Sequence, residues 1–211
     1  MTSKIMKYVL SFAAALLLVV SLSSLQKETQ KKGWVKLFDG KSLDGWKVGE
    51  NAETFKVEDG AIVVFGNRAH LFYMGPVNNH AFKNFEYKAT VMTKPGANSG
   101  MYIHTAYQEE GWPTQGYEIQ VNNSHTDWRR TGSVYGIQDV KEAPAKDDTW
   151  FTQHIIVQGN KITVKVDGKT INEYTVPAEG GKLSTGTFAL QGHDPKSKVY
   201  YKDVMVKALP D

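Results

Sequence analysis

Apolar and polar residues alternate with a period of two along most of the chain after residue 32. Residues 85–91 and 161–166 show this alternation most clearly, as strands with one buried face do. The second run leads into Asp167-Gly168, a tight-turn signal, and then into residues 169–176. These segments therefore predict a β-hairpin.

The same pattern, broken by turn signals, predicts further strands. They fall at residues 61–65, 100–104, 117–121, 154–157, 187–191 and 199–207. No helical periodicity longer than about three turns follows the N-terminal segment, and many of the 19 glycines lie between the strand-like runs. We therefore predict an all-β fold, a two-sheet antiparallel sandwich. Residues 33–211 contain no internal repeat and no linker, which indicates a single domain.

The N-terminal segment has the pattern of a secretory signal peptide. Lys4 and Lys7 precede an apolar run of about 14 residues, which is short against the roughly 20 that span a membrane, and small residues follow it. We predict a signal peptide over residues 1–25 and a flexible leader over residues 26–32, with an uncleaved anchor as the alternative. The expected location is the periplasm or the outside medium.

Charge and cysteine content narrow the functional classes. Removing residues 1–25 takes away two lysines and no acidic residue, which lowers the formal net charge from +3 to +1. A nearly neutral protein has no electrostatic attraction to nucleic acid or to an anionic membrane. The absence of cysteine excludes a lipoprotein anchor and any thiolate chemistry.

Hydrogen-bonding side chains share one face of a predicted strand. Over residues 117–121 and just beyond, Glu118, Gln120 and Asn122 point to one side, because strand side chains alternate. In the preceding strand, Tyr102 and His104 likewise share a face. If the two strands are neighbours, these side chains form a polar groove; a solvated outer face is the alternative.

The predicted strand at residues 187–191 adds Gln191 and, just after it, His193 to one face. A histidine beside a carboxylate can move protons near neutral pH. A conventional glycosidase needs two carboxylates. Sandwich-fold glucanases often carry them as Glu-x-Asp-x-x-Glu, whereas here only Glu118 is acidic and amides stand at Gln120 and Asn123. A two-carboxylate mechanism on this strand is therefore not expected.

The six histidines show no close His-x-His or His-x-x-x-His spacing, so we predict no transition-metal site. A structural calcium site made from backbone carbonyls and Asp or Asn side chains is compatible with the sequence. No cofactor is required by any motif, since there is no phosphate-binding loop and no Gly-x-Ser-x-Gly elbow.

Residues 33–46, Gly-Trp-Val-Lys-Leu-Phe-Asp-Gly-Lys-Ser-Leu-Asp-Gly-Trp, resemble the opening of the 3-keto-disaccharide hydrolase family. Further matching segments follow in the family's order: residues 98–100, 117–121, 131–135, Trp150 and residues 189–193. The resemblance implies a concanavalin A-like jelly roll with a site on its concave sheet around Glu118, Gln120 and His193. The chain differs from the common family pattern at His104, at Asn122-Asn123 and at Lys202-Asp203.

The resemblance also implies a substrate class, glycosides oxidised at C3. A ketone at C3 acidifies the C2 proton, so one base can remove it and expel the C1 substituent, after which water adds back. Glu118 and His193 are the expected base and acid, in either order. Tyr102, His104 and Gln120 are expected to hold the C3 oxygen. Further expected sugar contacts are Asn122, Tyr135, Gln191 and Trp128.

Two other functions are compatible with the same residues. A non-catalytic carbohydrate-binding module shares the fold and the polar strand face, and Trp112 and Trp128, in loops, are candidates for its aromatic platform. An envelope scaffold protein without a sugar ligand is the third reading, which a large exposed apolar patch would support.

Overall fold

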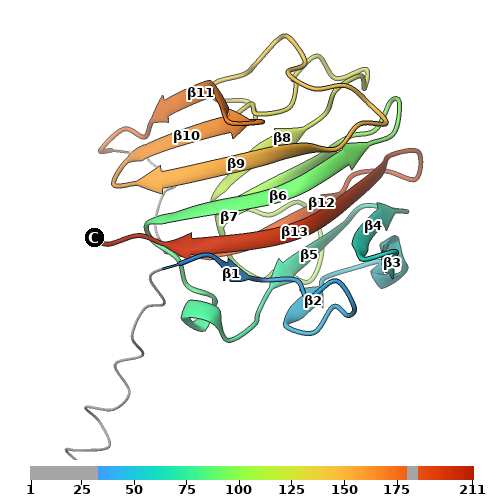
Figure 1. Cartoon of the computed structure of the whole chain (residues 1–211), viewed down its shortest axis with the longest axis horizontal. Helices are drawn as coiled ribbons and strands as arrows, with labels where there is room; N and C mark the ends of the chain where they lie inside the picture. The colour runs from blue at the N-terminus through green and yellow to red at the C-terminus, as the bar shows by residue number, and fades with distance from the viewer. Residues whose placement is uncertain (1–32, 180–184) are drawn as a thin grey trace, which may run out of the picture. The chain divides into compact units, whose positions relative to one another are not determined.

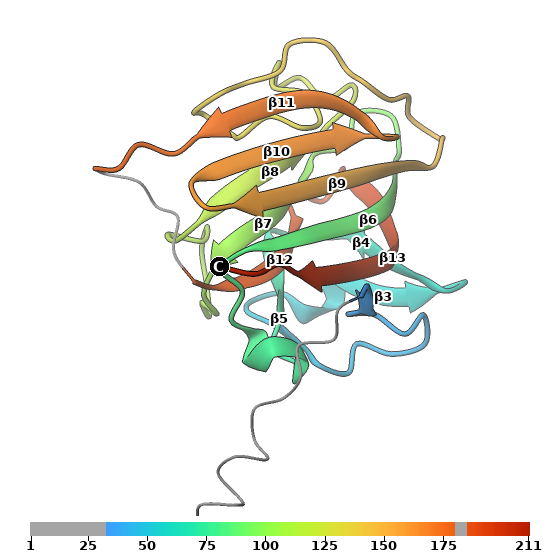
Figure 2. The same cartoon turned by 60° about the vertical axis from the view of Figure 1, so that its left-hand side comes forward.

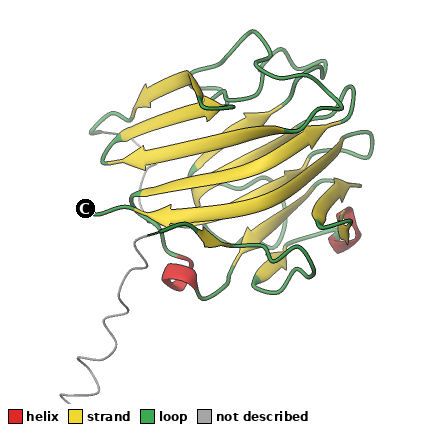
Figure 3. Ribbon diagram, in the orientation of Figure 1, coloured by secondary structure: helices red, strands yellow, loops and turns green. Residues whose placement is uncertain are grey.

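The computed structural model describes residues 33–179 and 185–211, almost wholly as strands and loops (Figure 3). The predicted signal peptide, residues 1–25, and leader, residues 26–32, lie outside the described residues. Two short 3-10 helices, η1 (Ala52–Thr54) and η2 (Val77–His80), interrupt the strands. Within these ranges no helix has the length and apolar character needed to cross a membrane.

The strands of the described residues form two antiparallel sheets (Figure 1). The eight-stranded sheet has the order β11-β10-β9-β6-β13-β4-β3, with β1 also paired to β13, and the five-stranded sheet has the order β2-β5-β12-β7-β8. The strands are β1 (Val35–Lys36), β2 (Trp46–Val48), β3 (Phe55–Glu58), β4 (Ala61–Phe65), β5 (Ala69–Tyr73), β6 (Phe85–Thr93), β7 (Ser99–Thr105), β8 (Tyr117–Val121), β9 (Phe151–Gln158), β10 (Lys161–Val166), β11 (Lys169–Thr175), β12 (Thr187–Gly192) and β13 (Lys198–Ala208).

The two sheets lie face to face, as Figure 2 shows, so the predicted two-sheet antiparallel sandwich is confirmed. Strands β4, β8 and β10 have the predicted bounds. Strands β1, β2, β3 and β5 were not predicted. In β5 all five residues are buried, so alternation of apolar and polar positions is absent there. The other three are only two to four residues long.

The core between the sheets is built around stacked aromatic rings. Phe188 of β12 lies parallel to Tyr87 of β6, with ring centroids 4.1 Å apart, and also contacts Phe82 and Phe85. All four rings are fully buried. Gln191, a predicted site residue, lies on the other face of β12. The stack of rings therefore fixes the strand that carries it.

The long connection over residues 122–150 folds back along the edge of β8. The backbone N–H of Gly132 donates to Gln120 O (2.9 Å), and the N–H of Tyr135 donates to Glu118 O (3.0 Å). Residues 131–135 thus pair with the edge strand almost as a further strand would, and they cover an edge that would otherwise be open. The pairing places Tyr135 beside Glu118.

Replacing Phe188 by alanine should lower the free energy of unfolding by about 3–5 kcal/mol, because it leaves a cavity between the sheets. Phe65→Ala is the matched control, since that ring is 49% exposed, and it should change stability by less than about 1 kcal/mol. Urea unfolding followed by tryptophan fluorescence measures both. Equal losses for the two variants would contradict the assignment of the core.

Candidate functional site

The polar side chains predicted for one strand face lie on the face of the five-stranded sheet that points away from the core. In β8, Tyr117, Ile119 and Val121 are buried in the core, so Glu118 and Gln120 point outward. Adjacent strands supply the other members: Tyr102 of β7 pairs with Glu118 across the ladder, and Gln191 lies on β12 on the far side of β7. Strands β7 and β8 are thus neighbours, which is the condition on which the polar groove was expected.

A glycine between these strands lets their side chains meet. Gly100 lies on β7, between β8 and β12, and a Cβ placed on it would lie 2.4 Å from Glu118 Oε1. The Glu118 side chain therefore lies across β7, over the space that a larger residue would fill. This allows its carboxylate to reach Gln191.

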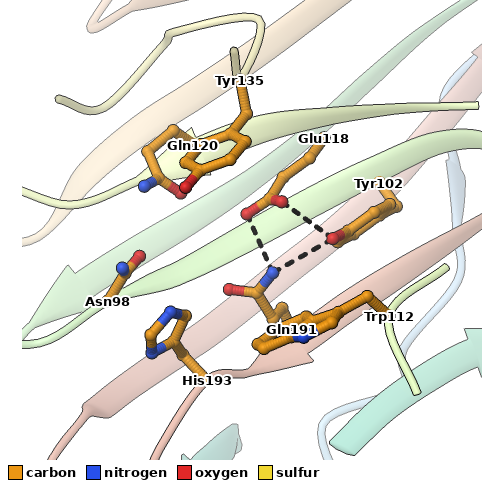
Figure 4. A pocket seen from close by; sticks show the side chains of 8 residues that line it. All are labelled: Asn98, Tyr102, Trp112, Glu118, Gln120, Tyr135, Gln191 and His193. Carbon is orange, nitrogen blue, oxygen red and sulfur yellow. Dashed lines mark hydrogen bonds between the residues drawn. The ribbon is translucent and has the colours of Figure 1, made fainter. Parts of the chain in front are cut away.

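Side chains of neighbouring strands donate hydrogen bonds to the Glu118 carboxylate, and Figure 4 draws those from Tyr102 and Gln191. Tyr102 donates its hydroxyl to Oε2 (2.8 Å), and Gln191 Nε2 donates to Oε1 (2.8 Å). With the Gln120 amide oriented so that its nitrogen faces acceptors, Gln120 Nε2 lies 3.1 Å from Oε1 and 2.8 Å from Ser99 O. These donors leave one lone pair of Oε2 free to accept a proton.

Burial raises the pKa of the Glu118 carboxyl from 4.5 to about 7, although the hydrogen bonds from Tyr102 and Gln191 favour its charged form. Burial, together with the charge of Glu118, also raises the pKa of Tyr102, so the phenol remains a neutral donor. Glu118 thus gains or loses its proton near neutral pH, as a general base or acid must.

Glu118 lies in a cavity of about 420 Å³, and every residue that lines it carries a hydrogen-bonding group on its side chain. Gln191 Oε1 is buried there and has no hydrogen-bond partner in the described part of the chain, so it is available to a ligand hydroxyl. Two aromatic side chains of the lining are partly open to solvent, Trp112 (44%) and Tyr135 (40%). The lining consists of Asn98, Tyr102, Trp112, Glu118, Gln120, Tyr135, Gln191 and His193.

The Trp112 ring packs against a charged and an aromatic side chain. Arg68 lies 5.6 Å from the ring, and His70 contacts it edge-on at 5.6 Å. Glu50 accepts from Arg68 (2.8 Å) and from the N–H of Gly111 (2.9 Å), which anchors the loop that carries Trp112. Burial lowers the pKa of His70 to about 4, so His70 packs as a neutral ring.

Six of the nine predicted site residues line this cavity. They are Glu118, His193, Tyr102, Gln120, Tyr135 and Gln191. The structure contradicts the placement of the other three, His104, Asn122 and Trp128.

His104 points into the sandwich core rather than into the groove. Its backbone has φ +51°, in the left-handed region, where the pairing of β12 with β7 changes register. This irregularity breaks the alternation, so the ring packs edge-on against Phe85 (5.3 Å) and its Nε2 lies 2.9 Å from Lys83 O. The predicted contact of His104 with a C3 oxygen is therefore wrong.

Asn122 is fully buried and organises the loop beside it instead of contacting the cavity. Its Nδ2 donates to the carbonyls of Asp127 (2.9 Å) and Arg129 (2.7 Å), and its Oδ1 accepts from the N–H of His125 (2.8 Å). Trp128, in that loop, is 48% exposed and lies under the Arg129 guanidinium, outside the cavity lining. Asn122 was predicted as a sugar contact from strand alternation, which ends at Val121, and Trp128 from its residue type and its place in a loop.

His193 belongs to a cluster that its sequence spacing did not indicate. The fold brings His125, His193 and Asp194 together with ligand-type atoms within 4.8 Å of one another, an arrangement that could hold a divalent metal. His193 Nδ1 lies 2.7 Å from Asp194 Oδ2, and the His125 and His193 ring centroids are 5.5 Å apart.

Sequence reasoning also missed Asp194 and Asn98 as site residues. Asp194 stands in the sequence Asp-Pro-Lys-Ser, a turn signal in which an aspartate accepts backbone N–H bonds two and three residues later. That signal predicts a rigidly held carboxylate next to His193. The available signal for Asn98 was its place at the start of residues 98–100, one of the segments that match the family.

The sequence pattern of the 3-keto-alpha-glucoside-1,2-lyase-like domain matches residues 33–207. The chain belongs to this family. No curated protein matches it. The family assignment agrees with the resemblance found from the sequence motifs.

Solved structures with the same fold include a candidate glycosyl hydrolase from Parabacteroides distasonis, with 22% identity and a TM-score of 0.71, covering 88% of this chain and 98% of the other. The carbohydrate-binding module CBM66 of Bacillus subtilis has 10% identity and a TM-score of 0.56, covering 78% and 96%. A β-glucanase of Bacillus licheniformis has 11% identity and a TM-score of 0.58, covering 87% and 100%. These similarities establish the concanavalin A-like jelly roll.

The raised pKa of Glu118 makes stability depend on pH. Because its pKa in the folded protein lies above the unfolded value, Glu118 destabilises the fold increasingly as pH rises from 4.5 to about 7. The Glu118→Gln variant lacks this effect, so its stability relative to wild type should improve by about 3 kcal/mol between about pH 4 and about pH 8.

Urea unfolding of both proteins at several pH values measures this difference. Glu58→Gln is the control, since Glu58 is exposed on β3 and should give curves parallel to wild type. Parallel curves for Glu118→Gln as well would mean that Glu118 has an ordinary pKa.

Proposed function

We propose that this protein cleaves 3-keto-glycosides by removing the C2 proton and expelling the C1 substituent, and that water then adds to the resulting enone. The observation that carries the proposal is a lone carboxylate, Glu118, with a pKa near 7, in one cavity with a histidine. The family to which the chain belongs supports a carbohydrate as the ligand.

The cavity chemistry fits an elimination better than a conventional glycosidase. Among the residues that line the cavity, Glu118 is the sole carboxylate, whereas retaining and inverting glycosidases need two. A C3 ketone removes that requirement, because it makes the C2 proton acidic enough for a single base. The remaining lining supplies hydrogen-bond donors and acceptors for sugar hydroxyls.

Glu118 and its neighbours fit the first step of this reaction. As an unprotonated carboxylate, Glu118 can take the C2 proton on the free lone pair of Oε2. The negative charge then moves to the C3 oxygen. Tyr102 and Gln191, which donate to the Glu118 carboxylate, can then donate to the C3 oxygen instead. Since Tyr102 stays neutral, it donates rather than competes for the proton.

A carbohydrate-binding module is the second candidate. Trp112 and Tyr135 flank the cavity with exposed rings, and such rings stack on sugar faces in binding sites. This reading predicts binding of unoxidised glycans without turnover.

Purified protein should release the alcohol and 3-keto-glucose from a methyl 3-keto-glucoside, followed by NMR. Glu118→Gln should lower kcat by about 100- to 10,000-fold, because it removes the proton acceptor and keeps the side chain's shape. Glu58→Gln, on the outer strand β3, should leave kcat unchanged. Glycan binding without cleavage of any 3-keto-glycoside would favour the binding module.

Gly100→Ala tests the geometry independently of charge. A Cβ at this position must displace the Glu118 carboxylate, which is the movable end of a flexible side chain, so the fold should survive. Displacement by about 1 Å should lower kcat by about 100-fold, with a smaller effect on KM. Unchanged kcat in a folded Gly100→Ala protein would contradict a role for the observed Glu118 position.

A further inference from the structure

His193 and Asp194 form a hydrogen-bonded pair that fixes which nitrogen of the histidine reacts. Asp194 Oδ2 lies 2.7 Å from His193 Nδ1. Partial burial raises the pKa of Asp194, but hydrogen bonds from Ser197, His193 and the backbone lower it to about 2. An ionised carboxylate only accepts hydrogen bonds, so Nδ1 carries the proton and Nε2 is the nitrogen that exchanges one.

Asp194 is itself held rigidly. Its Oδ1 accepts from the backbone N–H groups of Lys196 (2.8 Å) and Ser197 (3.2 Å), and its Oδ2 accepts from Ser197 Oγ (2.7 Å). Ser197 Oγ also accepts from the N–H of Asn98 (2.8 Å), which ties the pair to the start of β7. Asp194 therefore fixes the orientation and the tautomer of the His193 ring, as the aspartate of a catalytic triad does.

His125 completes the surroundings of His193 as a neutral neighbour. The backbone N–H of Asp127 donates to His125 Nδ1 (3.0 Å), so the proton of a neutral His125 ring lies on Nε2. Burial and the nearby charge of His193 lower the pKa of His125. A neutral His125 adds no positive charge beside His193.

The same hydrogen bonds bear on the alternative of a metal site. Nδ1 of both histidines and both oxygens of Asp194 already have partners, and His125 Nε2 carries a proton. His193 Nε2 is the one nitrogen of the pair with a free lone pair. These hydrogen bonds suit proton transfer at His193 Nε2. A metal ion bound by all three residues would have to break some of them.

The reaction proposed above needs two separate proton-transfer groups, one for C2 and one for the oxygen on C1. The neutral donors that suit a C3 oxyanion, Tyr102 and Gln191, are clustered around Glu118, so the C2–C3 side of the sugar fits there. His193 lies on the side of Gln191 that is away from Glu118, as Figure 4 shows. Its ring centroid is 5.4 Å from that of the exposed Trp112 ring.

We propose that His193, positioned by Asp194, is the acid and base for the oxygen on C1, while Glu118 moves the C2 proton. This assignment rests on the proposed function. Glu118 takes the C2 proton, the C1–O bond breaks, and the departing oxygen takes the proton from His193 Nε2. Neutral His193 then accepts a proton from the water that adds to C1, and Glu118 returns its proton to C2. Both groups end in their starting states.

Two assays separate the two roles. The first follows exchange of the C2 hydrogen of 3-keto-1,5-anhydroglucitol in deuterium oxide by NMR; this sugar has no leaving group, so only the C2 base acts. The second compares cleavage of methyl and 4-nitrophenyl 3-keto-glucosides, because a nitrophenolate leaves without protonation.

Glu118→Gln should lose exchange and both cleavages. His193→Gln, whose amide can still donate to Asp194, should lower methyl glucoside cleavage by about 1,000-fold but nitrophenyl cleavage and exchange by less than about 10-fold. Asp194→Asn should act in the same direction, lowering kcat for methyl glucoside cleavage by about 10- to 100-fold with little change in KM, because the His193 ring loses its orientation. Asp44→Asn, at an exposed aspartate, is the matched control.

Equal loss of exchange and of both cleavages in His193→Gln would overturn the assignment, since His193 would then be the C2 base. Loss of wild-type activity in EDTA, restored by Zn²⁺ or Mn²⁺, would overturn it in favour of a metal held by His125, His193 and Asp194. A wild-type protein that neither exchanges nor cleaves would instead refute the proposed function itself.

Discussion

The site depends on one buried carboxylate held between neighbouring strands. Glu118 reaches across β7 only because Gly100 has no side chain, and there it meets Tyr102 and Gln191. Burial alone would drive the carboxyl to its protonated form, and the hydrogen bonds alone would keep it charged. Their balance leaves its pKa near 7, where a proton can move in either direction.

The rest of the structure serves to hold these strands in register. The Phe188–Tyr87 stack fixes β12 against the opposite sheet, and the backbone pairing of residues 131–135 covers the outer edge of β8. The same pairing carries Tyr135 to the cavity, while the Glu50–Arg68 pair anchors Trp112 on the other side. A sugar-sized cavity thus forms over a sheet that is otherwise closely packed on both faces.

The two ionisable centres differ in how they are built. Glu118 accepts hydrogen bonds from neutral side chains, whereas His193 is hydrogen-bonded to an ionised carboxylate that fixes its tautomer. Two proton-transfer groups with such different surroundings suit complementary roles. Sequence patterns placed Glu118 and His193 on one face but gave no reason to prefer either role.

Alternation along the chain was enough to predict the sandwich and to place five of the residues that line the cavity on strand faces, because strand side chains alternate between two faces. The sixth, Tyr135, was expected from the family resemblance. Alternation failed at His104, where a left-handed backbone turns the ring into the core, and at Asn122, whose amide bonds its own loop. It also could not place His125 beside His193 and Asp194, since that contact joins loops far apart in sequence. Which face a residue occupies is a local property of the chain. Which loops meet over that face is decided only when the two sheets pack. The hydrogen bonds between those loops then decide which side-chain atoms carry protons.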